Sequence, residues 1–318
     1  MQIERQTFTG LSEAEWLDLR KDDITSTEVA ALFGQSPYQT TFELYHVKRG
    51  AIASSFQMND RVEAGQFLEP AIAAYAAHKF GLVLEPLKGH YARIPALRLG
   101  ASFDYLVVGG EGVPEHLRQH LPFPLDCKNK DWLQFKREEW EAGDPGEIQT
   151  PFHIMLQMIQ QELCGGYGAS AVAVLVGGND LRICWQEHAP GAAAKIVAAA
   201  EDFWAAIAED REPSPDFARD GEILKRLFAR PDPRLALPEE ALLPAMAAVA
   251  REVEASDEIK AATARKDHAR AEIMSLMREA EEARLPDGAK ITWKATKTGS
   301  RTLRITAAKP EPAAIAAE

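Results

Sequence analysis

The alternation of helical and extended apolar patterns between residues 61 and 209 constrains the fold of this chain most. Apolar residues recur with helical spacing in three segments, at 61–80, 148–164 and 191–209. Short apolar runs bounded by glycine, proline or polar residues are typical of strands, and they occur at 82–84, 90–94, 99–108, 124–128, 170–176 and 181–186. This order predicts an α/β fold in which helices flank a mixed sheet.

The preceding segment, residues 13–50, is predicted to form a helix, a loop, a helix, a turn and a helix. Thr25 and Glu28 have the spacing of a capping box, in which the threonine caps a helix and the glutamate reaches back to the backbone. Gly34 is expected to end that helix, because glycine adopts the left-handed conformation common at helix C-termini.

The residues after Glu209 are predicted to form a linker and an appendage. Prolines and charged residues are frequent at 211–238, whereas 239–283 has helical spacing that predicts two long helices or a helical hairpin. A pair of strands that turns at Gly299 is predicted over residues 290–305. The predicted domains are a core at 1–210, the linker at 211–238, a helical and β-hairpin appendage at 239–309, and a disordered tail at 310–318.

The formal net charge of −12 argues against a protein that coats nucleic acid, because phosphate binding depends on Lys and Arg displacing counterions. It is compatible with an enzyme that acts on DNA, since a local basic groove can coexist with an acidic exterior. The three cysteines are widely spaced without a C-x-x-C pair, so no zinc or redox pair is expected. No segment approaches the ~18 apolar residues of a membrane span, and no signal peptide precedes the core, which predicts a cytoplasmic protein without a membrane partner.

Asp126 and Lys128 lie two residues apart in a predicted strand, so both side chains emerge on one face while Cys127 points to the other. This triplet is common by chance, and a surface ion pair is the alternative interpretation. The strand before it, 99–108, contains a single carboxylate, Asp104, among apolar neighbours. Burial of such a charge is costly unless it is paired or binds a metal, although Asp104 also fits the solvent end of a strand.

Two carboxylates and a lysine are the groups that hydrolysis of a phosphodiester requires. Mg²⁺ prefers hard oxygen ligands, commonly one or two carboxylates with water and phosphate. The ion polarises the phosphate and generates the attacking hydroxide, while a lysine orients the water or neutralises charge in the transition state. Asp104, Asp126 and Lys128 therefore indicate a metal-dependent phosphodiester hydrolase.

Five segments in this order, 24–38, 65–70, 100–104, 125–128 and 157–161, carry a resemblance over residues 12–210. Together they resemble the YqaJ-like viral recombinase family, which includes phage lambda exonuclease and belongs to the PD-(D/E)xK nuclease superfamily. The resemblance implies a restriction-endonuclease-like core and a 5′-to-3′ exonuclease on linear double-stranded DNA, acting in phage or prophage recombination. It also implies Mg²⁺ as cofactor, with Mn²⁺ able to substitute, a single-strand annealing protein as partner, and a homotrimer.

The resemblance also assigns the metal site. Asp104, Asp126 and the carbonyl of Cys127 would be the metal ligands, and Lys128 would be the catalytic lysine. The family usually has Glu where this chain has Asp126, so the ligand is shorter by one methylene group.

Two further catalytic positions follow from the resemblance. Glu69 would approach the metal-bound waters from its helix, and Gln157 would position the site or the scissile phosphate. A solvated helix carboxylate and a surface amide are the respective alternative interpretations.

Arg20 and Thr27 match the Arg and Ser with which the family holds the terminal 5′-phosphate of DNA, at the same spacing. A guanidinium and a hydroxyl at a helix N-terminus form a suitable anion site. The capping box explains the same segment without any ligand, and the family often has Gly-Gly-Ser where this chain has Thr-Ser-Thr.

Other functions stay open at this point. A RecB-like or Cas4-like repair nuclease, or an endonuclease, shares the core, but those with an iron–sulfur cluster need four cysteines and this chain has three. A non-catalytic DNA-binding protein is the alternative from another class, and a metal-dependence assay on linear DNA separates it from an enzyme.

The C-terminal segment 290–309 contains several basic residues and no acidic one: Lys290, Lys294, Lys297, Arg301, Arg304 and Lys309. Such a strip is suited to DNA phosphates, and Trp293 to stacking on a base. The alternative is a solvated face of a hairpin that packs against the core.

Overall fold

The apolar runs form two separate sheets in the computed structural model, which describes residues 4–55, 58–87, 89–138, 140, 148–297 and 299–308. The larger sheet has five strands in the order β3-β6-β7-β8-β9. Their bounds are Leu82–Pro86 (β3), Tyr105–Gly110 (β6), Phe123–Lys130 (β7), Ala169–Val176 (β8) and Asp180–Glu187 (β9). Neighbouring strands are antiparallel except β7 and β8, which run parallel. The predicted mixed sheet is confirmed.

A smaller sheet has four strands in the order β1-β4-β5-β2. Their bounds are Gln6–Phe8 (β1), Tyr91–Ile94 (β4), Leu99–Ser102 (β5) and Ile24–Thr25 (β2). The prediction of one strand over 99–108 is wrong, because the chain breaks at Phe103 and Asp104 into β5 and β6, which belong to different sheets. The apolar pattern continues through this break, so periodicity alone gives no signal of it.

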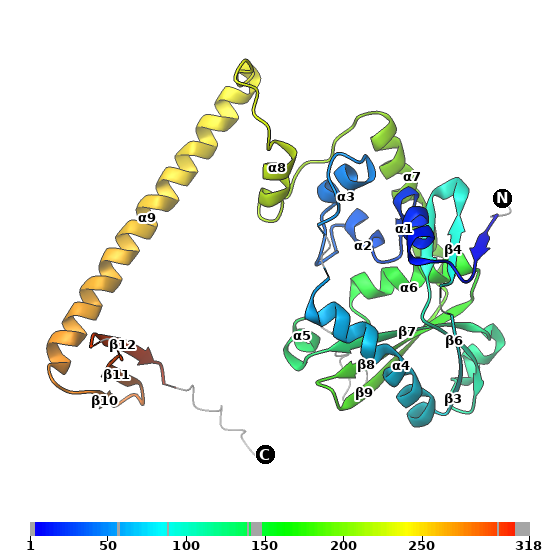
Figure 1. The fold of residues 1–318 in the computed structure, drawn as a ribbon, viewed down its shortest axis with the longest axis horizontal. Coiled ribbons are helices and arrows are strands. Elements are labelled where there is room, and N and C mark those ends of the chain that lie inside the picture. The colour runs from blue at the N-terminus through cyan, green and yellow to red at the C-terminus, as the bar shows by residue number, and fades with distance from the viewer. Residues whose placement is uncertain are drawn as a thin grey trace, which may run out of the picture. The chain divides into compact units, whose positions relative to one another are not determined.

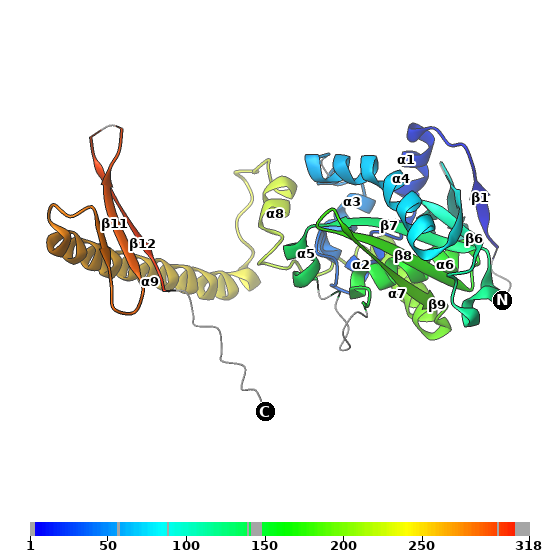
Figure 2. The same cartoon turned by 90° about the horizontal axis from the view of Figure 1, so that it is seen from below.

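The predicted helices are present, and two of them cover the two faces of the larger sheet (Figure 2). They are α1 (Glu13–Asp22), α2 (Val29–Leu32), α3 (Thr41–Lys48), α4 (Asp60–Phe80), α6 (Phe152–Gly165) and α7 (Pro190–Ala208). α6 begins at Phe152, next to the start expected near Pro151, because Pro151 occupies the N-cap and proline disfavours a helical residue before it. Short elements that were not predicted are α5 (Trp132–Arg137) and the 3₁₀ helices η1 (Pro95–Leu97) and η2 (Glu115–His120).

Helix α6 packs against both sheets. On one side Leu156 and Ile159 join the apolar cluster formed with the smaller sheet, α2 and α7. On the other side Ile154 and Met158 pack with residues of β8. Figure 1 shows α6 crossing this part of the chain between α2 and the larger sheet, and Figure 2 shows α4 on the opposite side of that sheet. Polar side chains on α6 are therefore enclosed from two directions.

The capping box predicted for Thr25 and Glu28 is only half present. The Glu28 carboxylate accepts hydrogen bonds from the Thr25 N–H and from the Thr25 hydroxyl, each at 2.9 Å. The threonine does not cap α2, which begins at Val29 with Glu28 at its N-cap. Pairing of β2 with β5 holds Thr25 in an extended strand, a constraint that comes from outside the motif.

The chain divides into two compact units, Met1–Arg230 and Pro231–Glu318. The first unit extends into the segment predicted as a linker, where α8 (Gly221–Leu227) forms. Asp220 accepts a hydrogen bond from the Thr40 hydroxyl at 2.6 Å, and Arg219 donates to the Ser36 carbonyl at 2.8 Å. These contacts attach the residues after α7 to the loop between α2 and α3.

The second unit consists of one long helix and a small sheet. Helix α9 (Glu239–Met277) is continuous, so the predicted pair of helices is wrong; the segment contains no glycine that would break it. The strands β10 (Glu282–Arg284), β11 (Lys290–Ala295) and β12 (Arg301–Thr306) form an antiparallel sheet in that order. A third strand thus joins the predicted hairpin. The predicted tail at 310–318 lies outside the described residues.

None of the helices that the structure describes is both long enough and apolar enough to cross a bilayer.

Candidate active site

Strand β7 presents Asp126 and Lys128 on one face of the larger sheet, as their spacing predicted. Cys127 points to the other face and packs against the apolar cluster under α4. Asp126 is buried, with 4% of its surface exposed, whereas the Lys128 side chain keeps 22% exposed. The pair therefore lies at the boundary between interior and solvent, with the carboxylate on the inner side.

The Asp126 carboxylate is held by three side chains. Its Oδ2 atom pairs with the Lys128 ammonium and accepts a hydrogen bond from the Gln157 amide at 3.2 Å. Its Oδ1 atom accepts from the Gln161 amide at 3.3 Å. Both glutamines come from α6 and are buried, so Gln157 is not a surface amide. The protein itself thus fixes the orientation of both carboxylate oxygens.

Asp104 lies at the junction between β5 and β6, and its side chain reaches β7. Its Oδ2 atom accepts a hydrogen bond from the Cys127 N–H at 2.9 Å. Burial raises the pKa of Asp104 well above its ordinary value, and the charges of Asp126 and Glu69 raise it further, while Lys128 opposes them. The break between the two sheets therefore brings a second carboxylate next to Asp126, where the repulsion between them favours a bound cation.

Lys128 supplies the positive charge of this cluster. Burial would lower the pKa of its ammonium, but the carboxylates of Asp126 and Asp104 outweigh burial and raise that pKa. Lys128 consequently stays protonated at neutral pH. A protonated lysine donates hydrogen bonds and stabilises negative charge, but it does not accept a proton.

Glu69 approaches the same cluster from α4. It is partly exposed, and its charge adds to the effect of burial in raising the pKa values of Asp104 and of the Cys127 thiol. Because α4 and α6 cover opposite faces of the sheet, Glu69 and Gln157 reach the cluster from different sides.

The donor atoms of the cluster fit Mg²⁺. The N–H and C=O of one strand residue project to the same strand edge, so the Cys127 carbonyl lies on the side where its N–H meets Asp104. Two carboxylates and a carbonyl are hard oxygen donors, which Mg²⁺ prefers. Within the described part of the chain, no three His, Cys, Asp or Glu side chains gather into a metal site by themselves. Metal binding here would therefore need the carbonyl, water or phosphate in addition to the carboxylates.

Arg20 and Thr27 both neighbour Glu28. The Arg20 guanidinium lies 4.2 Å from the centre of the Trp16 ring. Burial lowers the pKa of Arg20, and the nearby Glu28 carboxylate opposes the shift. Thr27 is exposed, and its hydroxyl lies 3.2 Å from that of Thr25, which donates to Glu28.

A series of contacts connects Arg20 with the carboxylate cluster. Trp16, against which Arg20 stacks, donates its Nε1–H to the Ser102 hydroxyl at 2.8 Å. The Ser102 carbonyl accepts a hydrogen bond at 3.1 Å from Gln161, which also donates to Asp126. The same part of the fold therefore positions Arg20 and Asp126.

Gln161 was missed by the sequence reasoning, although one signal for it exists. It follows Gln157 by four residues, which places both amides on the same face of a helix. Gln160, between them, donates instead to the carbonyls of Ile24 at 2.7 Å and Gly100 at 2.9 Å, and so connects β2 with β5. The glutamines of α6 thus divide between the carboxylate cluster and the smaller sheet.

If the cluster catalyses metal-dependent cleavage of DNA, as its residue types predict, replacing Gln161 by alanine is expected to lower that activity by about 10–100-fold, the usual effect of losing a partner that orients a metal ligand. Part of the loss should be recovered at higher Mg²⁺ concentration, because the variant binds the ion more weakly. Gln161→Met keeps the side-chain volume without the amide and should show the same loss. Gln119→Ala, at an exposed position, is the control. An unchanged Mg²⁺ dependence of the initial rate would contradict this role for Gln161.

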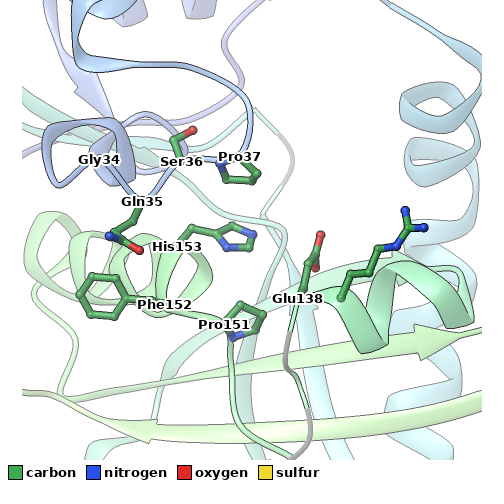
Figure 3. A pocket seen from close by; sticks show the side chains of 9 residues that line it. Gly34, Gln35, Ser36, Pro37, Glu138, Pro151, Phe152 and His153 are labelled. Carbon is green, nitrogen blue, oxygen red and sulfur yellow. The ribbon is translucent and has the colours of Figure 1, made fainter. Parts of the chain in front are cut away.

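A pocket of about 340 Å³ opens near the first turn of α6 (Figure 3). It is lined by Gly34, Gln35, Ser36, Pro37, Arg137, Glu138, Pro151, Phe152 and His153. Burial lowers the pKa of His153, and Lys130 and Lys128 lower it further against the effect of Glu138, so the imidazole is neutral at neutral pH. His153 precedes Gln157 by four residues on α6, so the pocket lies one helical turn from a residue that contacts Asp126, although none of the predicted site residues lines it.

Part of the chain matches a known protein family. Residues 15–168 match the family described as YqaJ-like viral recombinase domain. The resemblance predicted from the five motifs is therefore confirmed over most of the segment that carries it. Comparison with curated proteins gives no match.

The solved structures that match this chain include these three. An alkaline exonuclease from Laribacter hongkongensis has a TM-score of 0.45 and 19% identity, over 66% of this chain and 99% of that chain. The structure of the same enzyme in complex with dAMP has a TM-score of 0.44 and 19% identity, over 68% and 98%. A structure described as SSO0001 has a TM-score of 0.31 and 13% identity, over 68% and 88%.

Proposed function

We propose that the protein, whose residues 15–168 match the YqaJ-like viral recombinase domain, is a Mg²⁺-dependent 5′-to-3′ exonuclease for linear double-stranded DNA. The proposed setting is phage or prophage recombination. Mn²⁺ is proposed to substitute for Mg²⁺, since both ions take oxygen ligands.

The convergence of Asp104, Asp126 and Lys128 is the observation that carries this proposal. The two carboxylates come from different parts of the chain, and each raises the pKa of Lys128. A structural ion pair needs only one carboxylate for one ammonium. The second carboxylate, Asp104, has a pKa raised by burial and by the charge of Asp126, and its presence is explained when a divalent cation binds between the two.

Each residue has a proposed part in the reaction. Bound Mg²⁺ would polarise the scissile phosphate and activate a water molecule. Asp104, Asp126 and the Cys127 carbonyl would hold the ion, and Lys128, which stays protonated, would stabilise negative charge developing on the phosphate. Glu69 would orient a water molecule from the side of α4.

Gln157 holds Asp126 through its amide, so its proposed part is to keep the carboxylate in the orientation for metal binding. Its contact with Asp126 explains why an amide is buried there. The same argument applies to Gln161.

Digestion in one direction requires recognition of the DNA end, because the metal site meets the same backbone at every step. Arg20 and Thr27 are the residues proposed to bind the terminal 5′-phosphate. A guanidinium offers paired N–H donors to a phosphate, and the Thr27 hydroxyl is exposed. The contacts through Trp16 and Ser102 fix the position of Arg20 relative to the proposed metal ligands.

Replacing Arg20 by alanine is expected to slow digestion of 5′-phosphorylated ends by about 10-fold or more relative to 5′-hydroxyl ends, since a hydrogen bond to a charged group contributes about 1.5–3 kcal/mol. The measurement is the initial rate on linear duplexes that differ only in the terminal group. Arg230→Ala removes an exposed arginine elsewhere and serves as the control. Equal losses on both kinds of end would show that Arg20 does not bind the terminal phosphate.

The overall function is tested with duplexes labelled separately at each 5′ and 3′ end, in the presence of Mg²⁺ or of a chelator. Release of the 5′ label first, and only with the metal, is the expected result. Covalently closed circles should resist the protein. Efficient cutting of closed circles would exclude an exonuclease, and cleavage in the presence of chelator would exclude the metal mechanism.

The proposal extends to partners. Removal of the 5′ strand leaves a 3′ overhang, which is the substrate of a single-strand annealing protein. The resemblance further implies a homotrimer, and light scattering of the purified protein measures its mass directly. A monomeric mass would remove the trimer from the proposal and leave the chemistry of the site unaffected.

A further inference from the structure

The second unit concentrates positive charge on its sheet. The segment from Ala289 to Ala308 contains five basic residues and no acidic one, although the whole chain has a net charge of −12: Lys290, Lys294, Lys297, Arg301 and Arg304. The function proposed above does not use any of these residues. Their placement on the sheet decides which of them a ligand can reach.

Strand register separates the side chains of β11 and β12 onto two faces. Trp293 is opposite Leu303, and Ile291 is opposite Ile305. Ile291 and Leu303 form an apolar cluster with Met277 at the end of α9, so this face is the inner one. The alternate residues therefore form the outer face, called here the Lys–Thr face: Lys290, Thr292, Lys294, Thr302, Arg304 and Thr306.

One basic residue of this segment, Arg301, belongs to the inner side together with Trp293. The Arg301 guanidinium lies 3.7 Å from the centre of the Trp293 ring and donates to the carbonyls of Arg278 and Ala280, each at 2.6 Å. Arg301 thus joins β12 to the chain that follows α9. Stacking of Trp293 on a base, expected from the sequence, is disfavoured because Arg301 covers the ring.

Lys294 and Arg304 are the available cations of the Lys–Thr face. Both are exposed, and neither forms a salt bridge with any residue that the structure describes. Lys290 differs, because its ammonium lies 2.9 Å from a carboxylate oxygen of Glu282. Lys294 is opposite Thr302 and Arg304 is opposite Thr292, so the two cations are diagonal neighbours about 7–8 Å apart at their backbones.

We propose that the Lys–Thr face binds the phosphate backbone of duplex DNA without reading its sequence. Lysine, arginine and threonine side chains are typical donors to phosphate oxygens, and all the side chains of this face belong to those types. On the same side of the sheet β10 adds one carboxylate, Glu282, which is opposite Thr292 and is balanced by its ion pair with Lys290. The six side chains of the Lys–Thr face include no aromatic ring that would stack on a base. Its function is to hold the chain on DNA, and the choice of duplex DNA as ligand rests on the proposed function.

The test compares two double variants of the full chain. Lys294→Ala with Arg304→Ala removes the available cations of the Lys–Thr face. Lys260→Ala with Arg265→Ala removes one lysine and one arginine from exposed positions on α9, so the net charge changes equally. Binding to a labelled linear duplex is measured by fluorescence anisotropy in a chelator, across a series of NaCl concentrations.

The slope of log K against log salt concentration is expected to become shallower by about 1.8 in the Lys294 and Arg304 variant, at about 0.9 for each lost phosphate contact. The α9 variant is expected to keep the wild-type slope. An unchanged slope in the first variant would overturn the proposal and leave the face to a different partner, such as an acidic protein. Equal changes in both variants would also overturn it, because net charge alone would then explain the result.

Cleavage by the same proteins separates this inference from the proposed function. At saturating DNA and with Mg²⁺, the Lys294 and Arg304 variant should cleave at the wild-type kcat, because neither residue belongs to the active site. If the slope differed between the wild type and the Lys294 and Arg304 variant as expected, but the wild type did not cleave DNA, the exonuclease proposal would fail and the inference about the Lys–Thr face would stand. If it cleaved DNA and both variants bound equally, only the inference about this face would fail.

Discussion

Replacing Lys128 or Asp126 by alanine is expected to reduce Mg²⁺-dependent cleavage of linear duplex DNA by at least about 100-fold, the order of loss seen when a charge-stabilising group leaves an active site. Lys128 is the protonated group beside the carboxylates, and Asp126 is the carboxylate that Gln157 and Gln161 hold. The initial rate at saturating DNA measures the effect. Binding of DNA in a chelator should change much less, because the roles proposed for these residues concern the metal ion and the reacting phosphate.

Two comparisons show whether the loss is chemical. Asp126→Asn keeps the shape of the side chain and removes its charge, so it should be as inactive as Asp126→Ala while unfolding near the wild-type temperature. Lys195→Ala removes an exposed lysine on α7 and should retain full activity. Near wild-type cleavage by Lys128→Ala would mean that the ammonium only balances the charge of Asp126.

Replacing Gly112 by alanine is expected to destabilise the first unit by about 3 kcal/mol, at the upper end of the usual cost of overpacking. A Cβ atom at this position would lie 1.6 Å from the carbonyl oxygen of Phe80 and 2.8 Å from its carbonyl carbon. Both are backbone atoms at the end of α4, so no side-chain rotation relieves the overlap. The melting temperature should fall by about 6–12 °C, at about 2–4 °C for each kcal/mol in a domain of this size.

Gly109 provides the matched control for this prediction. It precedes Gly112 by three residues, and a Cβ atom built on it meets nothing within 4 Å. Gly109→Ala should therefore melt within a few degrees of the wild type. If Gly112→Ala melted at the same temperature as Gly109→Ala, the turn after β6 would have to accommodate the methyl group by moving away from α4.

The local sequence pattern was sufficient to predict those elements that are determined by the residues within them. The spacing of Asp126 and Lys128 placed both on one strand face, and that orientation is observed together with the opposite orientation of Cys127. Helix α4 was predicted to within one residue at its start, because its apolar spacing and the following Gly81 are both visible in the sequence. In each case the signal and the structure it produces occupy the same short segment.

Other features depended on residues distant in the sequence. The break at Asp104 arises because β5 pairs with β2 and β4 while β6 pairs with β3 and β7. The half-formed capping box has the same origin, since pairing with β5 holds Thr25 in a strand. The local conformational preference of these residues does not indicate which strand they will pair with.

The sequence by itself determined the class of fold, the resemblance to the YqaJ-like family and the types of side chain in the candidate site, because the amounts and spacing of apolar and charged residues are local properties. Only the tertiary structure decided that Gln161 shares Asp126 with Gln157, that Arg20 is connected to the cluster through Trp16 and Ser102, and that Arg301 lies on the inner face of its sheet. Each of these depends on contacts between segments far apart in the chain. Such contacts form because the apolar faces of α6 and the sheets are buried together, and this burial brings polar residues on the same elements next to one another.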